Sequence, residues 1–305
     1  MIGFLLRRLG GALMVILAIS VLTFSMLHLV PGDPVAIMLG EQATAERISV
    51  LRQQLGLDRP LYVQYGTFLL NALQGDFGTS IRSGQPVLQE VTRQLPATLI
   101  LALSAVAIAA PLGILLGTVA AVTRSRFLEF LTTTVPLIGL SMPTFWSGLL
   151  MILLFSLYLE WLPVVGNAGL ASLIMPAIAL ALPASAVIAR MTRSTLAEVL
   201  GQDYVRTARA KGLLERVVTY KHALRNALIP TVTIIGLQFG GLIGGAVIVE
   251  SVFARPGLGR LAVNAILTRD FPMVQAVVLF GAVGYVLVNL LVDLLYSVLD
   301  PRIRQ

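Results

Sequence analysis

The sequence predicts an all-α integral membrane protein with six transmembrane helices. Of its 305 residues, 57% are hydrophobic and only 12% are charged, whereas an ordinary globular chain is about half apolar and about a quarter charged. Six uncharged stretches approach or exceed the roughly 20 residues that cross about 30 Å of hydrocarbon. They are Leu9–Val30, Ala97–Val122, Thr132–Tyr158, Leu173–Ala189, Ala227–Val249 and Val274–Val292.

The first of these stretches is expected to be a retained transmembrane helix. Arg7 and Arg8 precede it, which also fits the start of a secretory signal. The apolar run is, however, longer than the roughly 7–15 residues at the centre of a signal peptide, and no Ala-x-Ala cleavage pattern follows it. Pro31 and Pro34 instead end it abruptly.

The distribution of arginine and lysine predicts that both termini are cytoplasmic. With the N-terminus inside, the inner segments hold fourteen basic residues, eight of them between Arg190 and Arg225. The short outer loops, 159–172 and 250–273, hold only three. Because the excess of basic residues lies in the cytoplasmic loops of membrane proteins, this asymmetry predicts the orientation of the chain.

The chain between the first two spans is expected to form short helices, either on the outer membrane surface or packed against the mouth of the bundle. Pro60 is suited to begin a helix, and apolar residues follow it at helical spacing as far as Gly75. A second apolar stripe leads into the second span. The members of the two stripes are Leu61, Tyr65, Phe68, Leu69, Ala72 and Leu73, then Val87, Val91 and Leu95.

The expected divisions are an N-terminal helix (1–30), a periplasmic segment (31–96), a five-helix core (97–298) and a cytoplasmic tail (299–305).

Proline and glycine predict irregular, closely packed helices. The third stretch contains Pro143, and small polar and aromatic side chains interrupt it there. Such a break fits either ordinary packing or the wall of a translocation pathway. The pathway candidates are Ser141, Met142, Thr144, Phe145 and, in the fifth span, Gln238. Gly113 and Gly117 in the second span favour the close approach of a second helix, as do Gly240, Gly241, Gly244 and Gly245 in the fifth, and a smooth pathway wall is the alternative.

The basic segment between the fourth and fifth spans carries the strongest functional signal. It favours a helix from Asp203 to Lys211, and Gly212 is a natural stop. A second helical stretch, 214–228, leads into the fifth span. The alanines of the first helix permit close approach to another protein, while its cations supply steering and register. The same residues suit an interfacial helix that binds lipid headgroups, so both interpretations stay open on the residues alone.

This segment resembles the cytoplasmic coupling loop of ABC importer permeases. Thr207, Ala208 and Gly212 stand at matching positions, whereas Arg206 replaces a glutamate and Pro230 comes five residues later than in the general pattern. Both departures resemble the variant found in the dipeptide, oligopeptide, glutathione and nickel permeases. Further stretches along nearly the whole chain are similar to that branch: Val30–Pro34, Gln54–Leu61, Gly75–Gly78, Thr192–Ser194, Pro256–Gly259 and Asp300–Arg302.

The resemblance implies a type I ABC importer permease fold in the bacterial inner membrane, as the first of two paired subunits. The implied partners are a second homologous permease, two subunits that bind ATP and Mg, a periplasmic or lipid-anchored substrate-binding protein and membrane lipids, but no nucleic acid. The implied cargo is a short peptide, such as a dipeptide, an oligopeptide or glutathione, with nickel as the alternative. The implied ATPase contact consists of Tyr204, Arg206, Thr207, Ala208, Arg209, Ala210, Lys211 and Gly212.

Other functional classes lack the residues that they require. A Walker A loop needs Gly-Lys-Ser/Thr, but the only lysines, Lys211 and Lys221, are followed by Gly and His. The chain has no cysteine, and His28 and His222 have no partner at metal-ligand spacing, so neither a metal nor a cofactor is expected in it. No G-x-S-x-G or H-E-x-x-H motif of a membrane enzyme is present. A secondary transporter is the distant alternative, but no segment repeats and few ionisable groups lie within the spans.

Two carboxylates near the ends of spans are expected to be structural. Asp293 lies in the apolar end of the sixth span, where we expect an ion pair with Arg190 or Arg193 rather than coupling to a proton. Glu250 ends the fifth span, where we expect it to meet Arg255 rather than the binding protein.

Overall fold

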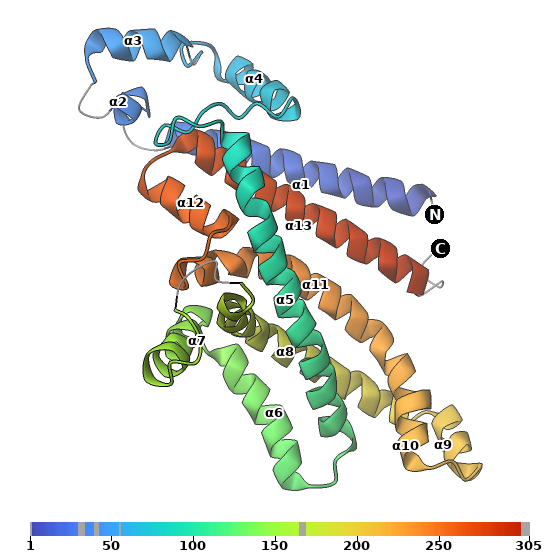
Figure 1. Cartoon of the computed structure of the whole chain (residues 1–305). Helices are drawn as coiled ribbons and strands as arrows, with labels where there is room; N and C mark the ends of the chain where they lie inside the picture. The colour runs from blue at the N-terminus through green and yellow to red at the C-terminus, as the bar shows by residue number, and fades with distance from the viewer. Residues whose placement is uncertain (1, 30–33, 40–42, 55, 165–168, 300–305) are drawn as a thin grey trace. The chain divides into compact units, whose positions relative to one another are not determined.

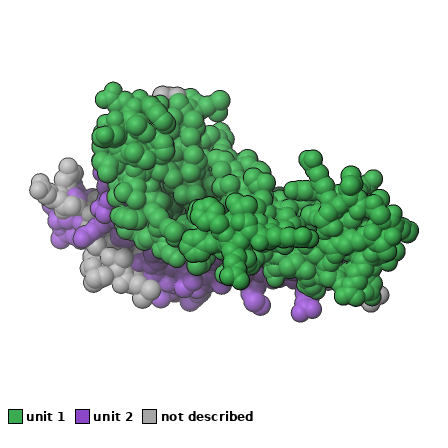
Figure 2. Space-filling view, turned by 90° about the horizontal axis from the view of Figure 1, so that it is seen from below, with its two compact units in different colours: residues 1, 99–255, 287–305 green, residues 2–98, 256–286 purple. Residues whose placement is uncertain are grey.

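The computed structural model describes residues 2–29, 34–39, 43–54, 56–164 and 169–299, and it builds them almost entirely from helices (Figure 1). The chain divides into two compact units, which Figure 2 shows in different colours. Unit 1 comprises Met1 and residues 99–255 and 287–305, and unit 2 comprises residues 2–98 and 256–286. The helices α5 (Val87–Val122) and α13 (Phe271–Leu299) contribute residues to both units. The predicted domain boundary at 96/97 therefore falls inside a continuous helix.

The N-terminal part of unit 2 contains one long apolar helix and three shorter ones. They are α1 (Ile2–Leu29), α2 (Pro34–Leu39), α3 (Ala45–Gln54) and α4 (Leu61–Leu73). α4 packs on α1, because the Tyr65 hydroxyl lies 2.9 Å from the Ser20 hydroxyl and the Tyr65 ring contacts Phe24 edge-on. The helix predicted after Pro60 is confirmed, with Pro60 at its N-cap position.

The rest of unit 2 is held together by a small apolar core and one buried carboxylate. Val87 and Val91, from the apolar stripe predicted before the second span, are fully buried against α12 (Leu258–Leu267) and the start of α13. Asp270, at the N-terminus of α13, accepts hydrogen bonds from the Ser80 hydroxyl at 2.5 Å and the Ile81 backbone N–H at 3.3 Å. The loop before α5 is thereby tied to α13.

Unit 1 is arranged around α8 (Ala171–Leu200), the most buried of the described spans. Six of its fourteen buried residues are alanine, which lets the neighbouring helices approach closely. The predicted close packing is confirmed at Gly113 and Gly117, whereas a Cβ atom at Gly241 or Gly244 of the fifth span would meet nothing within 4 Å. A Cβ atom added at Gly117 would lie 2.4 Å from the Ala189 carbonyl oxygen, and one added at Gly113 would lie 2.7 Å from Ile188. Only glycine fits at these two positions of α5.

The predicted helical stretch before the fifth span continues into that span without interruption. It consists of α10 (Glu215–Val217), the π-helical segment η3 (Val218–Ala223) and α11 (Leu224–Val252). Two contacts align α11 antiparallel to α8. The Thr195 hydroxyl donates to the Ala227 carbonyl at 3.1 Å, and a Cβ atom at Gly245 would lie 3.0 Å from the Leu180 side chain.

The third predicted span, Thr132–Tyr158, is not one continuous helix. Its first half is α6 (Arg126–Ser141), and its second half is α7 (Thr144–Met151) with the π-helical segment η2 (Ile152–Tyr158). The two halves are bent by 102° at Met142 and Pro143. The bend lies where small polar residues and proline predicted an interruption, because proline disfavours a helical conformation in the residue before it.

Five described helices are long and apolar enough to cross a membrane, and a sixth results if the bent pair counts as one span. α8 continues from Arg190 to Leu200, well past the predicted end of the fourth span, because charged residues at the membrane surface do not end a helix. Residues 30–33 of the Val30–Pro34 motif, and the predicted tail from Asp300 onward, lie outside the described residues.

Gly117→Ala is expected to destabilise the protein by roughly 1–3 kcal/mol, the usual cost of overpacking a close contact. Gly241→Ala is the matched control, because a Cβ atom there would meet nothing within 4 Å and alanine favours the helix. The measurement is the temperature at which the detergent-solubilised protein loses its monodisperse peak. Equal losses in the two variants would contradict close packing at Gly117.

Candidate coupling surface and membrane pathway

The predicted coupling helix is present as α9 (Asp203–Ala210). One face of α9 is buried against the chain's own core. Val205 is fully buried and Ala208 is only 7% exposed. Both belong to a compact apolar cluster that we call the anchor cluster. Its members are Leu196 of α8, Val205 and Ala208 of α9, Val218 and Ala223 of η3, and Ala227 of α11. α9 is therefore packed against both spans that it connects (Figure 1).

Gly212 ends α9 in a conformation that favours glycine. Its φ angle is +75°, in the left-handed region. The Gly212 N–H donates to the Arg209 carbonyl at 2.9 Å, and the Leu213 N–H donates to the Ala208 carbonyl at 3.4 Å. These two bonds form a Schellman motif, which satisfies carbonyls that the end of a helix leaves unpaired. The predicted stop at Gly212 is confirmed.

An ion pair closes the turn between α9 and α10. The Arg209 guanidinium contacts the Glu215 carboxylate through Nη2 at 2.7 Å and Nε at 3.1 Å, and its Nη1 donates to the Leu200 carbonyl at 3.4 Å. The hydrogen bond from Arg209 lowers the pKa of Glu215 below its ordinary value, and the same bond raises the pKa of Arg209. The pair therefore stays fully charged at neutral pH and keeps the turn closed.

A second brace joins α9 to α11. The Asn226 side-chain amide donates to the Tyr204 hydroxyl at 2.8 Å. Tyr204 and Arg209 thus flank the buried face of α9, and each is bonded to the chain's own residues. The opposite face presents Arg206, Thr207 and Ala210 to solvent.

The structure therefore separates the eight predicted contact residues into two groups. Arg206, Thr207, Ala210, Lys211 and Gly212 are exposed, and their contact with an ATPase stays a prediction. Tyr204 and Arg209 are exposed as well but also brace the helix, and their contact with an ATPase likewise stays a prediction. Ala208, by contrast, lies inside the anchor cluster.

The sequence alone predicts only part of this division between exposed residues and residues bonded within the chain. Val205 and Ala208 have the spacing of one helical face, which predicts that they point the same way. Nothing marked Glu215 and Asn226 as partners of Arg209 and Tyr204, because only the folding of the loop brings these side chains together.

The predicted pathway residues lie at two separate places in unit 1. Ser141 and Phe145 are exposed and Met142 and Thr144 half-buried around the bend between α6 and α7, while Gln238 is half-buried in α11. The Ser141 hydroxyl donates to the Leu137 carbonyl at 2.9 Å. Their role in a pathway stays a prediction.

Glu250 and Arg255 lie close together and buried at the end of α11. Glu250 is fully buried, Arg255 is 8% exposed, and the Arg255 N–H donates to the Glu250 carbonyl at 2.8 Å. Burial lowers the pKa of Arg255, and the negative charge of Glu250 opposes that shift. The hydrogen bond joins the two backbones, so an ion pair between the two side chains stays a prediction. The predicted pair of Asp293 with Arg190 or Arg193 is wrong: Arg193 is bonded to Glu129 at 2.6 Å, and Arg190 has no ion-pair partner among the described residues.

Comparison with known families gives two matches that together span almost the whole chain. The model of the binding-protein-dependent transport system inner membrane component matches residues 113–305. The N-terminal model of binding-protein-dependent transport system membrane components matches residues 1–102.

Similar proteins are named as transport permeases. The chain is 45% identical over 304 residues to the glutathione transport system permease protein GsiC of Salmonella paratyphi A, covering 100% of this chain and 99% of the relative. It is 44% identical, with the same coverage, to GsiC of Escherichia coli K12. A solved amino acid ABC transporter with histidines is 18% identical, with a TM-score of 0.51 over 70% of this chain and 94% of that one. This last likeness concerns the fold alone.

Gly212→Val is expected to loosen the end of α9, because a side chain in the left-handed region costs about 1–2 kcal/mol. Gly212→Asn is the matched control, since asparagine tolerates that conformation. Tryptic cleavage after Arg209 and Lys211 in the purified protein is the measurement. We expect cleavage to accelerate in the valine variant only, and similar rates in both variants would contradict the role assigned to Gly212.

Proposed function

Since the chain belongs to the family of binding-protein-dependent transport system inner membrane components, and is thus a multi-pass inner-membrane permease subunit of an ABC importer, we propose that it imports short peptides with energy from partner ATPases. The proposed cargo is glutathione or a peptide of similar size. ATP and Mg would be bound by those partners, and this chain would be non-catalytic. Both of its termini would lie in the cytoplasm.

The anchoring of α9 supports its role as the ATPase contact. Arg206 is 73% exposed in its side chain, and Thr207 and Ala210 lie on the same open face. The anchor cluster joins the other face of α9 to Leu196 of α8 and Ala227 of α11. A displacement of α9 is therefore transmitted to two spans at once.

This connection gives a physical account of coupling. Closure of the ATPases around ATP would move α9, and α8 and α11 would move with it because the braces at Arg209 and Tyr204 prevent α9 from turning by itself. ATP binding would then favour one arrangement of the spans over another through different contacts in the two states, which coupling requires.

Exposed apolar faces support the proposed assembly. α1, α6 and α7 present large hydrophobic side chains outward, including Met14 at 73% exposure and Phe127 at 68%. Lipid covers such faces in a membrane, and a second permease subunit would cover part of them. We propose one such homologous partner, two ATP-binding subunits and a substrate-binding protein on the outer side.

The proposed cargo rests on the full-length similarity to the two glutathione permeases. Glutathione is a tripeptide, so it also falls within the class of short peptides.

Ala210→Trp is expected to uncouple transport, because a large side chain on the open face of α9 would keep a partner surface at a distance. The complex should assemble in the membrane, while uptake and substrate-stimulated ATP hydrolysis fall by about tenfold or more, equivalent to about 1.4 kcal/mol of coupling. Ala210→Ser is the conservative control. Ala208→Trp should instead lower thermal stability, since Ala208 is buried. Normal uptake with Ala210→Trp would show that the ATPases bind elsewhere.

Reconstitution with the partner subunits in proteoliposomes tests the cargo. Glutathione, a set of dipeptides and Ni²⁺ are added in turn with the binding protein, and ATP hydrolysis is measured. We expect glutathione or small peptides to stimulate it. Stimulation by Ni²⁺ alone would refute the peptide cargo while leaving the ATP-driven mechanism intact.

A further inference from the structure

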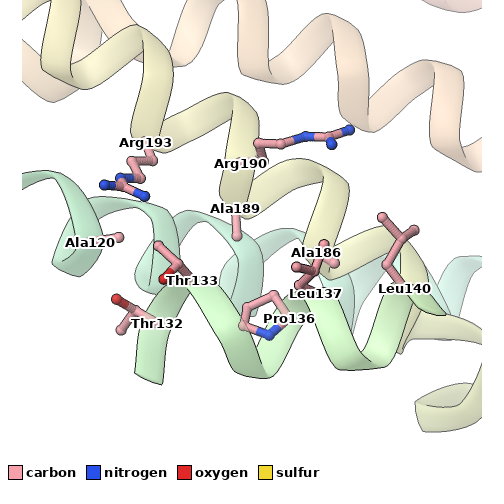
Figure 3. A pocket seen from close by; sticks show the side chains of 10 residues that line it. All are labelled: Ala120, Thr132, Thr133, Pro136, Leu137, Leu140, Ala186, Ala189, Arg190 and Arg193. Atoms are coloured by element: carbon pink, nitrogen blue, oxygen red, sulfur yellow. The ribbon is translucent and has the colours of Figure 1, made fainter. Parts of the chain in front are cut away.

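α7 and η2 connect α6 to α8 at one end of the core of unit 1. The Arg193–Glu129 ion pair joins the start of α6 to the later part of α8. A Cβ atom at Gly139, near the end of α6, would lie 3.8 Å from Leu182, nearer the start of α8. α6 and α8 are therefore antiparallel, and Figure 3 shows them along the pocket that they share. Since α11 is also antiparallel to α8, the end of α6, the start of α8 and the end of α11 lie at the same end of the core.

One side of α7 and η2 packs against that end of the core. A Cβ atom at Gly148 of α7 would lie 3.1 Å from the ring of Phe253, the residue that follows α11. The Ser156 hydroxyl of η2 donates to the Met175 sulfur, near the start of α8, at 3.8 Å. Phe155 packs against the same apolar core. The position of α7 and η2 is therefore fixed by contacts with both α8 and α11.

The geometry of α6 prevents α7 and η2 from being the outer half of a straight span. In the proposed orientation, α6 starts at the cytoplasmic surface with Arg126. Its 16 residues span at most about 24 Å, whereas the hydrocarbon layer is about 30 Å thick. α6 therefore ends within the outer leaflet, where the chain turns by 102°. Because α8 starts at that same end of the core, α7 and η2 run roughly in the plane of the membrane.

The other side of α7 and η2 is apolar and exposed. Four large side chains recur at every fourth residue along this side, and none of residues 144–158 is charged. A helix that is hydrophobic on all sides is typical of the hydrocarbon layer or of a protein interior, and not of a surface in contact with water. The four exposed side chains are Phe145, Leu149, Leu153 and Leu157.

Two aromatic side chains lie where η2 ends. Tyr158 and Trp161 are exposed, and the Trp161 ring centroid lies 6.2 Å from that of Phe155. The exposed carboxylate of Glu160 lies between them in the sequence. Tryptophan and tyrosine are enriched where the hydrocarbon layer meets water. This end of the segment therefore fits the boundary of a lipid layer better than the surface of another protein.

We propose that α7 and η2 form a lateral helix embedded in the outer leaflet, with Phe145, Leu149, Leu153 and Leu157 in contact with lipid acyl chains. Tyr158 and Trp161 lie at the level of the headgroups. The choice of the outer leaflet rests on the proposed orientation of the chain, with both termini in the cytoplasm. Phe145, a candidate for the pathway, then faces lipid and not cargo.

Electron paramagnetic resonance of spin labels tests this position, because the chain has no cysteine of its own. Single cysteines replace Leu149, Leu153 or Leu157, and the importer is assembled with cysteine-free partner subunits in proteoliposomes. We expect all three labels to collide readily with oxygen, which concentrates in lipid, rarely with a water-soluble nickel chelate, and to report the same depth. A helix that crosses the membrane would spread these positions over about 12 Å.

Phe130→Cys and Leu137→Cys are the matched controls, because both residues are exposed on α6, which crosses the membrane. Their labels should differ in depth by about 10 Å. Three outcomes would overturn the proposal: graded depths along the lateral helix, access of the nickel chelate to all three labels, or access of neither reagent. The last would show that a protein surface, such as the second permease, covers this face.

A separate measurement tests the choice of leaflet. Glu160→Cys should react with a membrane-impermeant maleimide added outside intact spheroplasts, and Arg126→Cys should react only after the membrane is opened. Reaction of Glu160→Cys from the inside alone would overturn the outer placement. None of these measurements requires transport, so their outcome is independent of the cargo and of the ATPase contact.

Discussion

The close packing of α8 against its neighbours is the constraint on which the rest of unit 1 depends. Within a bilayer the hydrophobic effect does not drive helices together, so association relies on contacts that small residues permit. Gly113 and Gly117 bring α5 against the backbone of α8, and alanines of α8 belong to the core that it shares with α5 and α11. Because the contacts at Gly113 and Gly117 leave no room for an added methyl group, α8 has a defined position against α5. The candidate coupling helix α9 packs against α8, whose position is fixed in this way.

The packing of α8 also explains how α9, a short exposed helix, can be connected to the transmembrane helices. α9 alone has only eight residues, too few to be stable in water as an isolated helix. It is held by apolar contacts with α8 and α11, by the Schellman turn at Gly212, and by the side-chain bonds of Arg209 and Tyr204. Each of these interactions is modest in energy. Together they keep α9 in one orientation, so that one face is available to a partner protein and the other is bonded to the spans.

The basic residues of unit 1 make different contacts, although the positive-inside rule counts each of them only as one positive charge. Arg209 closes a turn, Arg193 joins α8 to α6, and Arg206 faces solvent. Arg190 lines a pocket between α6 and α8 and has no protein partner in the described residues. An exposed ion pair contributes little to stability, so the main effect of the pairs made by Arg193 and Arg209 is to orient the helices that they join. This assignment depends on what each guanidinium contacts, which its position in the sequence does not reveal.

The sequence by itself determined the membrane class, the positions of the spans, the interruption near Pro143 and the stop at Gly212. These features follow from the length of apolar stretches and from the steric limits of single residues, which act locally. Only the tertiary structure decided that Ala208 faces inward, that Glu215 and Asn226 hold α9, and that a pocket forms between α6 and α8. Each of these depends on residues from different helices, and their meeting is set by how closely the helices pack. The anchor cluster therefore decides which face of α9 is exposed, although the sequence already predicts the helix itself.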